Sequence, residues 1–164
     1  ALAVDVLKQP TTTMKVYLWK PKGNNAGHLS LKLSDGTYIS FWPEENLQLK
    51  RKKRSGSRRY ADDVAAEGRN PDEILNLPED IVDQANIKTW WSDYVGRSGH
   101  HLLTENCALV VREALMAGEI YGHTHADLEI ALVGRLTTPT DVFRWANSCK
   151  LIYLEANRKI CSVS

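Results

Sequence analysis

The feature that most constrains the fold is a pair of alternating runs, 27–33 and 37–43, on either side of Asp35-Gly36. An Asp-Gly pair between two such runs is a strong signal for a β-hairpin. Because successive strand residues point to opposite faces, each run has an apolar and a polar face. The apolar positions are Leu29, Leu31 and Leu33, then Ile39 and Phe41; the alternate positions are His28, Ser30 and Lys32, then Tyr38, Ser40 and Trp42. The hairpin predicts an antiparallel sheet with His28 close to residues 41–43.

His28 is the candidate functional residue of this hairpin. It follows Gly27, opens a strand and lies on the polar face of that strand. Such a position suits a side chain that points into a cleft, and histidine changes its charge near neutral pH. The alternative is a surface histidine that bonds to solvent.

A second local pattern surrounds Cys107. Apolar residues at 109–111, 114 and 115 form a helical stripe, and Asn106 is a favourable N-cap. Cys107 would then lie in the first turn, where the helix dipole favours a thiolate and free backbone N–H groups could hold an oxyanion. The alternative is a buried structural residue, because free cysteine is among the most buried residue types.

The other segments predict an α+β fold. We expect strands at 14–19 and 151–154 to join the 28–42 hairpin in one antiparallel sheet, and residues 74–77 favour a further strand. Helices are expected at 79–95, 107–117 and 142–147, the last capped by Thr140 or Asp141, with a short helical turn at 61–68. Helices 79–95 and 107–117 should pack on the sheet, with the start of the Cys107 helix against the start of the His28 strand.

Length and composition fit a single domain. The chain has 164 residues and a formal net charge of +1, which is ordinary for a globular domain and implies no strong nucleic-acid field. We assign residues 1–13 to a linker, N-terminal extension or edge strand, and 14–164 to one domain with a basic insertion at 44–60. No apolar run approaches the ~20 residues of a membrane span. The start lacks the layout of a signal peptide, and the first residue is not Met, which leaves room for an upstream region.

The cysteines argue against a disulfide framework. Cys107, Cys149 and Cys161 are odd in number and widely spaced, which fits a reducing compartment such as the cytoplasm, or secretion into one as part of a larger protein. His123 and His125, expected in a loop, could be drawn with Cys107 as a metal site. A structural zinc site needs four ligands, usually in close pairs, so we expect no metal and no cofactor.

Five consecutive basic residues stand in the insertion: Lys50, Arg51, Lys52, Lys53 and Arg54. The simplest interpretation is an exposed, solvated loop. The functional alternatives are an anion-binding patch for anionic lipid, a nucleic-acid contact or a nuclear-import signal. Because no aromatic residues interleave with the run and no recognition motif accompanies it, we predict no specific nucleic-acid partner.

Three motifs together resemble a known superfamily. They are Gly27-His28-Leu29-Ser30-Leu31 on a strand, Asp35-Gly36 at a hairpin, and Leu102-Leu103-Thr104-Glu105-Asn106-Cys107 leading into a helix. This order resembles the circularly permuted papain-like (NlpC/P60-type) cysteine enzymes, which include lecithin:retinol acyltransferase-like proteins and PPPDE-type isopeptidases. In those relatives the His-bearing strands precede the Cys-bearing helix. The resemblance implies a permuted papain-like arrangement for residues 14–164; the basic insertion is not part of the motif.

The resemblance also implies roles for individual residues. Cys107 would be the nucleophile and His28 the base, with Asn106 positioning the nucleophile. Several relatives carry a second His, or an Asp or Asn, on the return strand, where this chain offers Ser40. A serine can hydrogen-bond an imidazole but supplies no charge.

We therefore expect a cysteine-dependent acyl-transfer enzyme, either a thiol peptidase or amidase or an acyltransferase, acting on a protein, peptide or lipid acyl substrate. The first alternative is a non-catalytic binding or targeting module that uses the basic loop on anionic lipid or another anionic partner. The second is a nucleic-acid-binding protein whose affinity falls steeply with salt.

Overall fold

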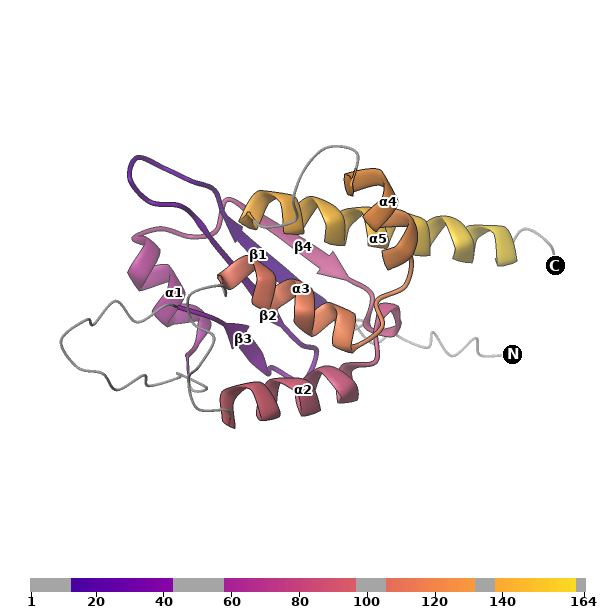
Figure 1. Ribbon diagram of the computed structural model, residues 1–164, viewed down its shortest axis with the longest axis horizontal. Coiled ribbons are helices and arrows are strands. Elements are labelled where there is room, and N and C mark those ends of the chain that lie inside the picture. The colour runs from indigo at the N-terminus through magenta and orange to yellow at the C-terminus, as the bar shows by residue number, and fades with distance from the viewer. Residues whose placement is uncertain (1–12, 43–57, 97–105, 132–137, 162–164) are drawn as a thin grey trace, which may run out of the picture.

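The computed structural model describes residues 13–42, 58–96, 106–131 and 138–161, and it shows an α+β fold built on one antiparallel sheet (Figure 1). The strands are β1 (Met14–Trp19), β2 (His28–Lys32), β3 (Tyr38–Ser40) and β4 (Glu73–Leu77). The helices are α1 (Tyr60–Glu67), α2 (Gln84–Gly96), α3 (Cys107–Ala117), α4 (His123–Ala131) and α5 (Pro139–Cys161), with a 3₁₀ turn η1 (Glu79–Ile81) before α2. The predicted basic run at 50–54 and residues 1–12 of the predicted extension lie outside the described residues.

The hairpin predicted around Asp35-Gly36 is confirmed as β2 and β3. Leu31 pairs with Ile39 and Ser30 with Ser40, so the apolar and polar positions of the two strands fall on matching faces. The turn closes where the Leu33 N–H donates to the Thr37 carbonyl at 2.8 Å. Continuing the register beyond Ser40 places Trp42 opposite His28, at the corner where β3 has ended.

The sheet order is β3-β2-β1-β4, and the prediction that 151–154 forms a strand of this sheet is wrong. Its fourth strand is β4, which pairs antiparallel with β1. Residues 151–154 lie inside α5, because the buried positions upstream recur at helical spacing: Val142, Trp145, Ala146 and Cys149. The partly buried pair Ile152 and Tyr153 continues that stripe, so tertiary packing overrides the strand propensity of Leu-Ile-Tyr-Leu.

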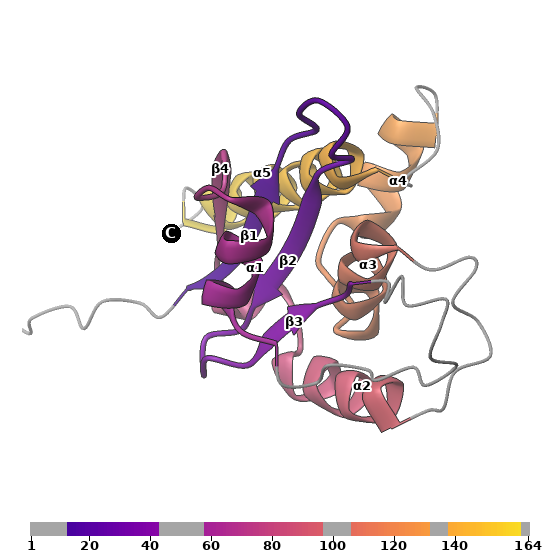
Figure 2. The same ribbon diagram turned by 90° about the vertical axis from the view of Figure 1, so that its left-hand side faces the viewer.

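Two helices cover one face of the sheet and form the core. α3 packs on β2 and β3, and α5 packs across β1, β2 and β4 (Figure 2). The strand residues on this face are fully buried: Val16, Leu18, Leu29, Leu31 and Ile39. They meet the apolar stripe predicted for α3, including Val110, Val111, Ala114 and Leu115, which confirms that the helix at 107–117 packs on the sheet.

The opposite face of the sheet is aromatic and is covered by α1. The Tyr60 ring of α1 lies 4.8 Å from the Tyr17 ring, 6.3 Å from the Trp19 ring and 6.4 Å from the Tyr38 ring, measured between centroids. The helical turn predicted at 61–68 is thus a short helix, and it ends at Gly68 in the left-handed conformation (φ 71°). α1 is the element that encloses the polar face bearing His28.

Two helix predictions and one loop prediction need correction. The helix expected over 79–95 is divided into η1 and α2, because Val82 is extended (φ −137°) and the Asp83 N–H pairs with the Gly118 carbonyl at 2.8 Å. His123 and His125 lie in α4 rather than in a loop. The last helix extends over Pro139–Cys161, and its cap is neither Thr140 nor Asp141: Thr138 Oγ1 accepts the Asp141 N–H at 3.2 Å.

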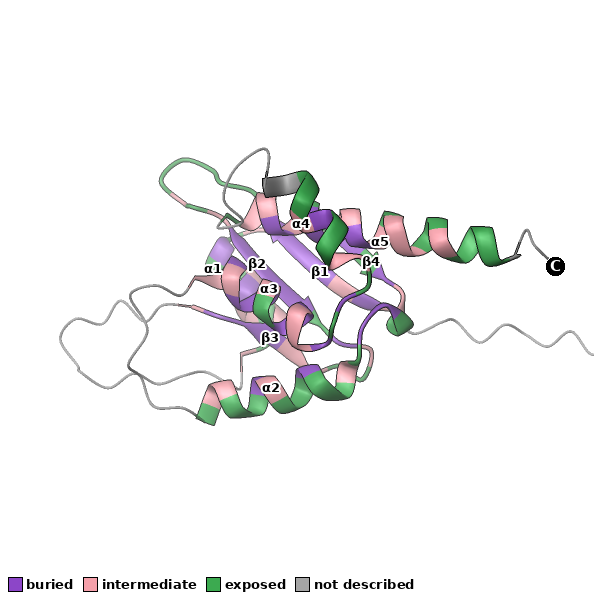
Figure 3. Ribbon diagram, turned by 45° about the vertical axis from the view of Figure 1, so that its right-hand side comes forward, coloured by how far each residue is buried: buried purple, intermediate pink, exposed green. Residues whose placement is uncertain are grey.

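Burial falls away along α5. The helix begins among buried residues, and its C-terminal half is largely exposed (Figure 3), with Leu151 and Leu154 at 58% and 44% exposure. Within the described ranges, no helix combines the length and the apolar character that crossing a membrane requires.

Candidate active site

The loop before β2 fixes where His28 begins the strand. Gly27 has φ 84°, and a Cβ there would lie 2.5 Å from the Trp19 carbonyl oxygen, so only glycine fits. The Gly27 N–H donates to Asn25 Oδ1 at 2.8 Å, and Asn25 Nδ2 donates to Glu67 of α1 at 2.8 Å. The position of His28 is therefore tied both to β1 and to α1.

His28 is buried rather than solvent-bonded. Its side chain is 2% exposed, between the rings of Trp19 and Trp42, whose centroids lie 5.5 and 4.6 Å from the imidazole centroid. Nε2 faces two acceptors, Ser40 Oγ at 2.9 Å and Asp63 Oδ2 at 3.1 Å. The interpretation of His28 as a surface histidine is wrong for this chain.

Asp63 is the central group of the site. Its side chain is fully buried, and five donors converge on its carboxylate. Oδ1 accepts from Trp42 Nε1 at 2.6 Å and Arg58 Nε at 2.5 Å; Oδ2 accepts from the Tyr38 hydroxyl at 2.5 Å, the Ser40 hydroxyl at 2.6 Å and His28 Nε2 at 3.1 Å. A buried carboxylate needs this many donors to remain ionised.

His28 and Asp63 stabilise each other in their charged forms. Burial would lower the pKa of His28, but its hydrogen bonds to Asp63 and Cys107 and its attraction to both groups raise that pKa to about 9. Burial would raise the pKa of Asp63, but His28, Ser40 and Tyr38 hold that pKa well below its usual range. At neutral pH the site therefore contains an imidazolium on a carboxylate.

Cys107 enters the same site from the start of α3. Asn106 has the extended conformation of an N-cap, and its Oδ1 accepts the Leu109 N–H at 2.9 Å, which confirms the predicted cap. Cys107 is half-buried in the first helical position, and its thiol lies close enough to His28 to help raise the pKa of the imidazole.

The structure thus brings together the residues that the sequence singled out here: Cys107, His28, Ser40 and Asn106. Ser40 contacts the imidazole as expected, but its hydroxyl also donates to Asp63. Asp63 therefore supplies the negative charge that a serine lacks. Sequence reasoning missed Asp63, because an Asp62-Asp63 pair in the first turn of a helix is what the helix dipole alone would favour.

Cys149 and His125 are separate from this site. Cys149 is fully buried in the core, where burial raises the pKa of its thiol to about 12. His125 forms an exposed ion pair with Glu129 along α4. Among the described side chains, no group of three or more metal-ligating residues is arranged to hold an ion.

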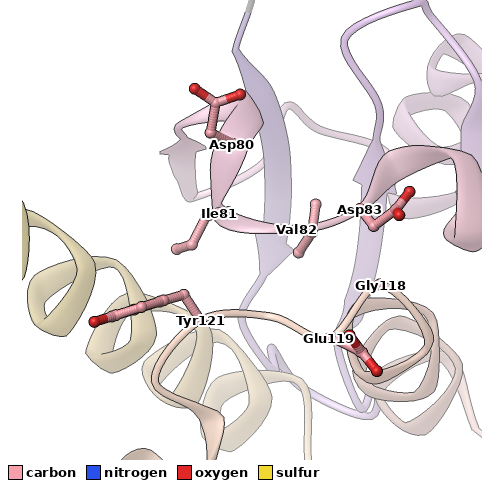
Figure 4. Close-up of a pocket in the computed structure, with 7 residues that line it drawn as sticks. All are labelled: Asp80, Ile81, Val82, Asp83, Gly118, Glu119 and Tyr121. Carbon is pink, nitrogen blue, oxygen red and sulfur yellow. The ribbon is translucent and has the colours of Figure 1, made fainter.

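A separate hollow of about 440 Å³ lies at the opposite end of α3 (Figure 4). The residues that line it come from η1, from the two residues after η1, and from the turn after α3: Asp80, Ile81, Val82, Asp83, Gly118, Glu119 and Tyr121. Because a helical residue rises about 1.5 Å, Gly118 lies roughly 16 Å along α3 from Cys107. This hollow is not part of the Cys107 site.

Comparisons with known proteins add no relative. The chain matches no family model, and neither the curated proteins nor the solved structures give a match. We therefore infer the function from the geometry around Cys107, His28 and Asp63.

Proposed function

We propose that this chain is a cysteine-dependent acyl-transfer enzyme, with Cys107 as nucleophile, His28 as acid and base, and Asp63 orienting the imidazole. The observation that carries the proposal is the position of His28 between two partners. Its Nε2 faces the fully buried carboxylate of Asp63, and the Cys107 thiol at the start of α3 is near enough to help raise the pKa of the imidazole. A nucleophile, a base and an orienting group brought together in this way form the arrangement that thiol acyl transfer requires.

The reaction follows from these contacts. In the proposed resting state the thiol proton already lies on His28, and the imidazolium beside Asp63 stabilises the thiolate of Cys107. The thiolate attacks an amide, ester or thioester carbonyl carbon, and the carbonyl oxygen becomes an oxyanion. Asn106 caps the Leu109 N–H of the first turn of α3, and the Cys107 N–H of the same turn is the candidate donor to that oxyanion.

Collapse of the intermediate breaks the bond to the leaving group, which takes the proton from His28 and leaves a thioester on Cys107. His28 is then neutral and can accept a proton from the second nucleophile. Water as that nucleophile gives a peptidase, amidase or thioesterase, whereas an amine or hydroxyl gives an acyltransferase. The substrate class in the proposal is an acyl group on a protein, peptide or lipid.

The permuted papain-like arrangement is part of this proposal. Two features support it: a His-bearing strand, β2, precedes the Cys-bearing helix, α3, and α3 packs on the hairpin that carries His28. The third member departs from the expected pattern, because the carboxylate comes from α1 rather than from the return strand β3. The alternative of an anion-binding module depends on residues 50–54, and nothing in the described residues favours it.

The test is covalent capture of the acyl group. The native protein is mixed with p-nitrophenyl acetate, and intact-mass and peptide spectrometry locate the acetyl group. We expect fast acetylation of Cys107 that falls by about 10²-fold or more in His28→Ala, with no change in Cys149→Ser. Acetylation of Cys107 at the same rate in wild type and His28→Ala would contradict the proposal.

A further inference from the structure

Arg58 belongs to the site but has no role in the steps above. Its Nε donates to Asp63 Oδ1 at 2.5 Å, and its side chain is only 19% exposed. The guanidinium also lies over the ring of Trp42, 4.5 Å from the centroid. The Trp42 ring also packs on His28. Arg58 is therefore linked to the imidazole indirectly, both through the carboxylate of Asp63 and through the ring of Trp42.

The hydrogen-bond donors to Asp63 form two groups, one on each carboxylate oxygen. Oδ2 faces the hydroxyls of Tyr38 and Ser40 and the imidazole, whereas Oδ1, among the described residues, faces Trp42 and Arg58. The donors on Oδ1 therefore set the rotation of the carboxylate about its Cβ–Cγ bond. A planar guanidinium held between a carboxylate and an indole ring is well suited to fix that rotation.

We propose that Arg58 controls His28 through Asp63: held on Oδ1 of the carboxylate, its positive charge limits how strongly Oδ2 retains the imidazole proton. The inference rests on the proposed function for its catalytic meaning. The effect of the Arg58 charge on the pKa of His28, transmitted through Asp63, does not require the protein to be an enzyme.

The sign of the effect follows from the charges around His28. Within the part of the chain that the structure describes, the groups that face its ring are Asp63 from α1, Cys107 from α3, Ser40 from β3, and the rings of Trp19 and Trp42. Tyr38 and Arg58 act on it through Asp63. Of these groups, Arg58 is the permanent cation. Removing its charge leaves Asp63 more negative for His28, so the imidazolium should hold its proton more tightly.

If the role of Arg58 were purely structural, its removal would lower the pKa of His28 instead of raising it. If Arg58 served only to keep the cluster packed, its loss would loosen the contact between Asp63 and His28. The pKa of His28 would then move from about 9 down toward the 6.5 of a free histidine. The two roles of Arg58 thus differ in the direction of one measurable quantity.

The experiment is a proton NMR titration of His28 in the full chain, with its ring signal assigned from its loss in His28→Ala. Arg58→Gln removes the charge and keeps an N–H donor, and Arg58→Lys keeps the charge without the planar fork. Arg59→Met is the matched control, because Arg59 is 81% exposed and pairs with Asp62. Arg58→Met is the second neutral variant if Arg58→Gln does not fold.

We expect the pKa of His28 to rise by about half a unit or more in the neutral variant, to change less in Arg58→Lys, and to stay unchanged in Arg59→Met. An unchanged or lowered pKa in the neutral variant, or equal shifts in Arg58→Gln and Arg58→Lys, would overturn the inference. Failure of the proposed function is read separately, as absence of acetyl-Cys107 in the wild-type protein.

Discussion

At the scale of single residues, the site depends on one buried carboxylate. Asp63 lies on α1, yet its five donors come from β2, from β3 and from residues 42 and 58. Removing such a group while its donors remain buried leaves them without an acceptor, at a penalty of ~1–3 kcal/mol for each unsatisfied group. We infer that Asp63 both fixes the local structure and sets the charge of His28.

Asp63→Asn tests this role, because asparagine keeps the shape of the side chain and removes its charge. We expect the pKa of His28 to fall from about 9 by about one unit or more, as measured by NMR titration. Asp62→Asn is the control, since Asp62 is the neighbouring carboxylate and its side chain is 42% exposed. An equal fall in both variants would show that Asp63 has no specific effect.

The sequence identified residues whose local pattern shows their function. A histidine after glycine on the polar face of a strand, and a cysteine after an asparagine cap, are each recognisable within a few residues. Asp63 has no such signal: its neighbour Asp62 is also an acid in the first turn, and only the packing of α1 on the sheet separates a capping carboxylate from a buried one.

At the scale of elements, prediction succeeded where turns and caps define the ends. The 28–42 hairpin has Asp-Gly at its turn, and α3 has Asn106 at its start, so both were predicted. The run 151–154 has strand-forming residues but no turn before it, and it is helical because Val142, Trp145 and Cys149 bury one continuous stripe of α5. α4 was missed because its first residues, His123-Thr124-His125, have low helix propensity.

Gly27→Ala tests how β2 is set in place. An added Cβ meets both the strain of φ 84° and a backbone oxygen at 2.5 Å, so we expect a loss of stability above ~2 kcal/mol, from the strain of a positive φ plus the clash. The measurement is urea unfolding, with the His28 titration as a second readout.

Gly36→Ala is the matched control for this change. Gly36 also has a positive φ, +94°, but no heavy atom lies within 4 Å of its added Cβ. It should lose only the strain contribution, ~1–2 kcal/mol, and leave the pKa of His28 unchanged. Equal losses in the two variants would mean that contact with β1 does not position the strand.

At the scale of the whole molecule, three distant parts of the chain meet at one corner of the sheet. β2 brings His28, α1 brings Asp63 and α3 brings Cys107. The folded state thereby places a charged pair where little water reaches it. The stability of the fold and the chemistry of the site should therefore depend on the same ionisations.

The pH dependence of unfolding tests this link. Because the pKa of His28 is raised to about 9 in the fold, its contribution is fully present below ~6.5, the unfolded value, and is lost as pH rises through about 9. Asp63, whose pKa is lowered in the fold, contributes above ~3.9 and loses that contribution as pH falls. The free energy of unfolding should thus be highest between ~4 and ~6.5.

Urea unfolding at a series of pH values from about 4 to about 9.5 measures this profile. The decline above ~6.5, of up to about 3 kcal/mol, should be much smaller in His28→Ala. A decline of the same size in that variant would show that other groups cause it.

The most direct test of the central claim is the rate at which iodoacetamide alkylates Cys107 across pH, in a Cys161→Ser background. If His28 activates Cys107, alkylation of Cys107 should be fast at neutral pH in the otherwise native protein. His28→Ala should slow it, and the buried Cys149 should not react in the native protein. If Cys107 stays inert until the chain is denatured, it is a structural residue, and the enzyme proposal fails.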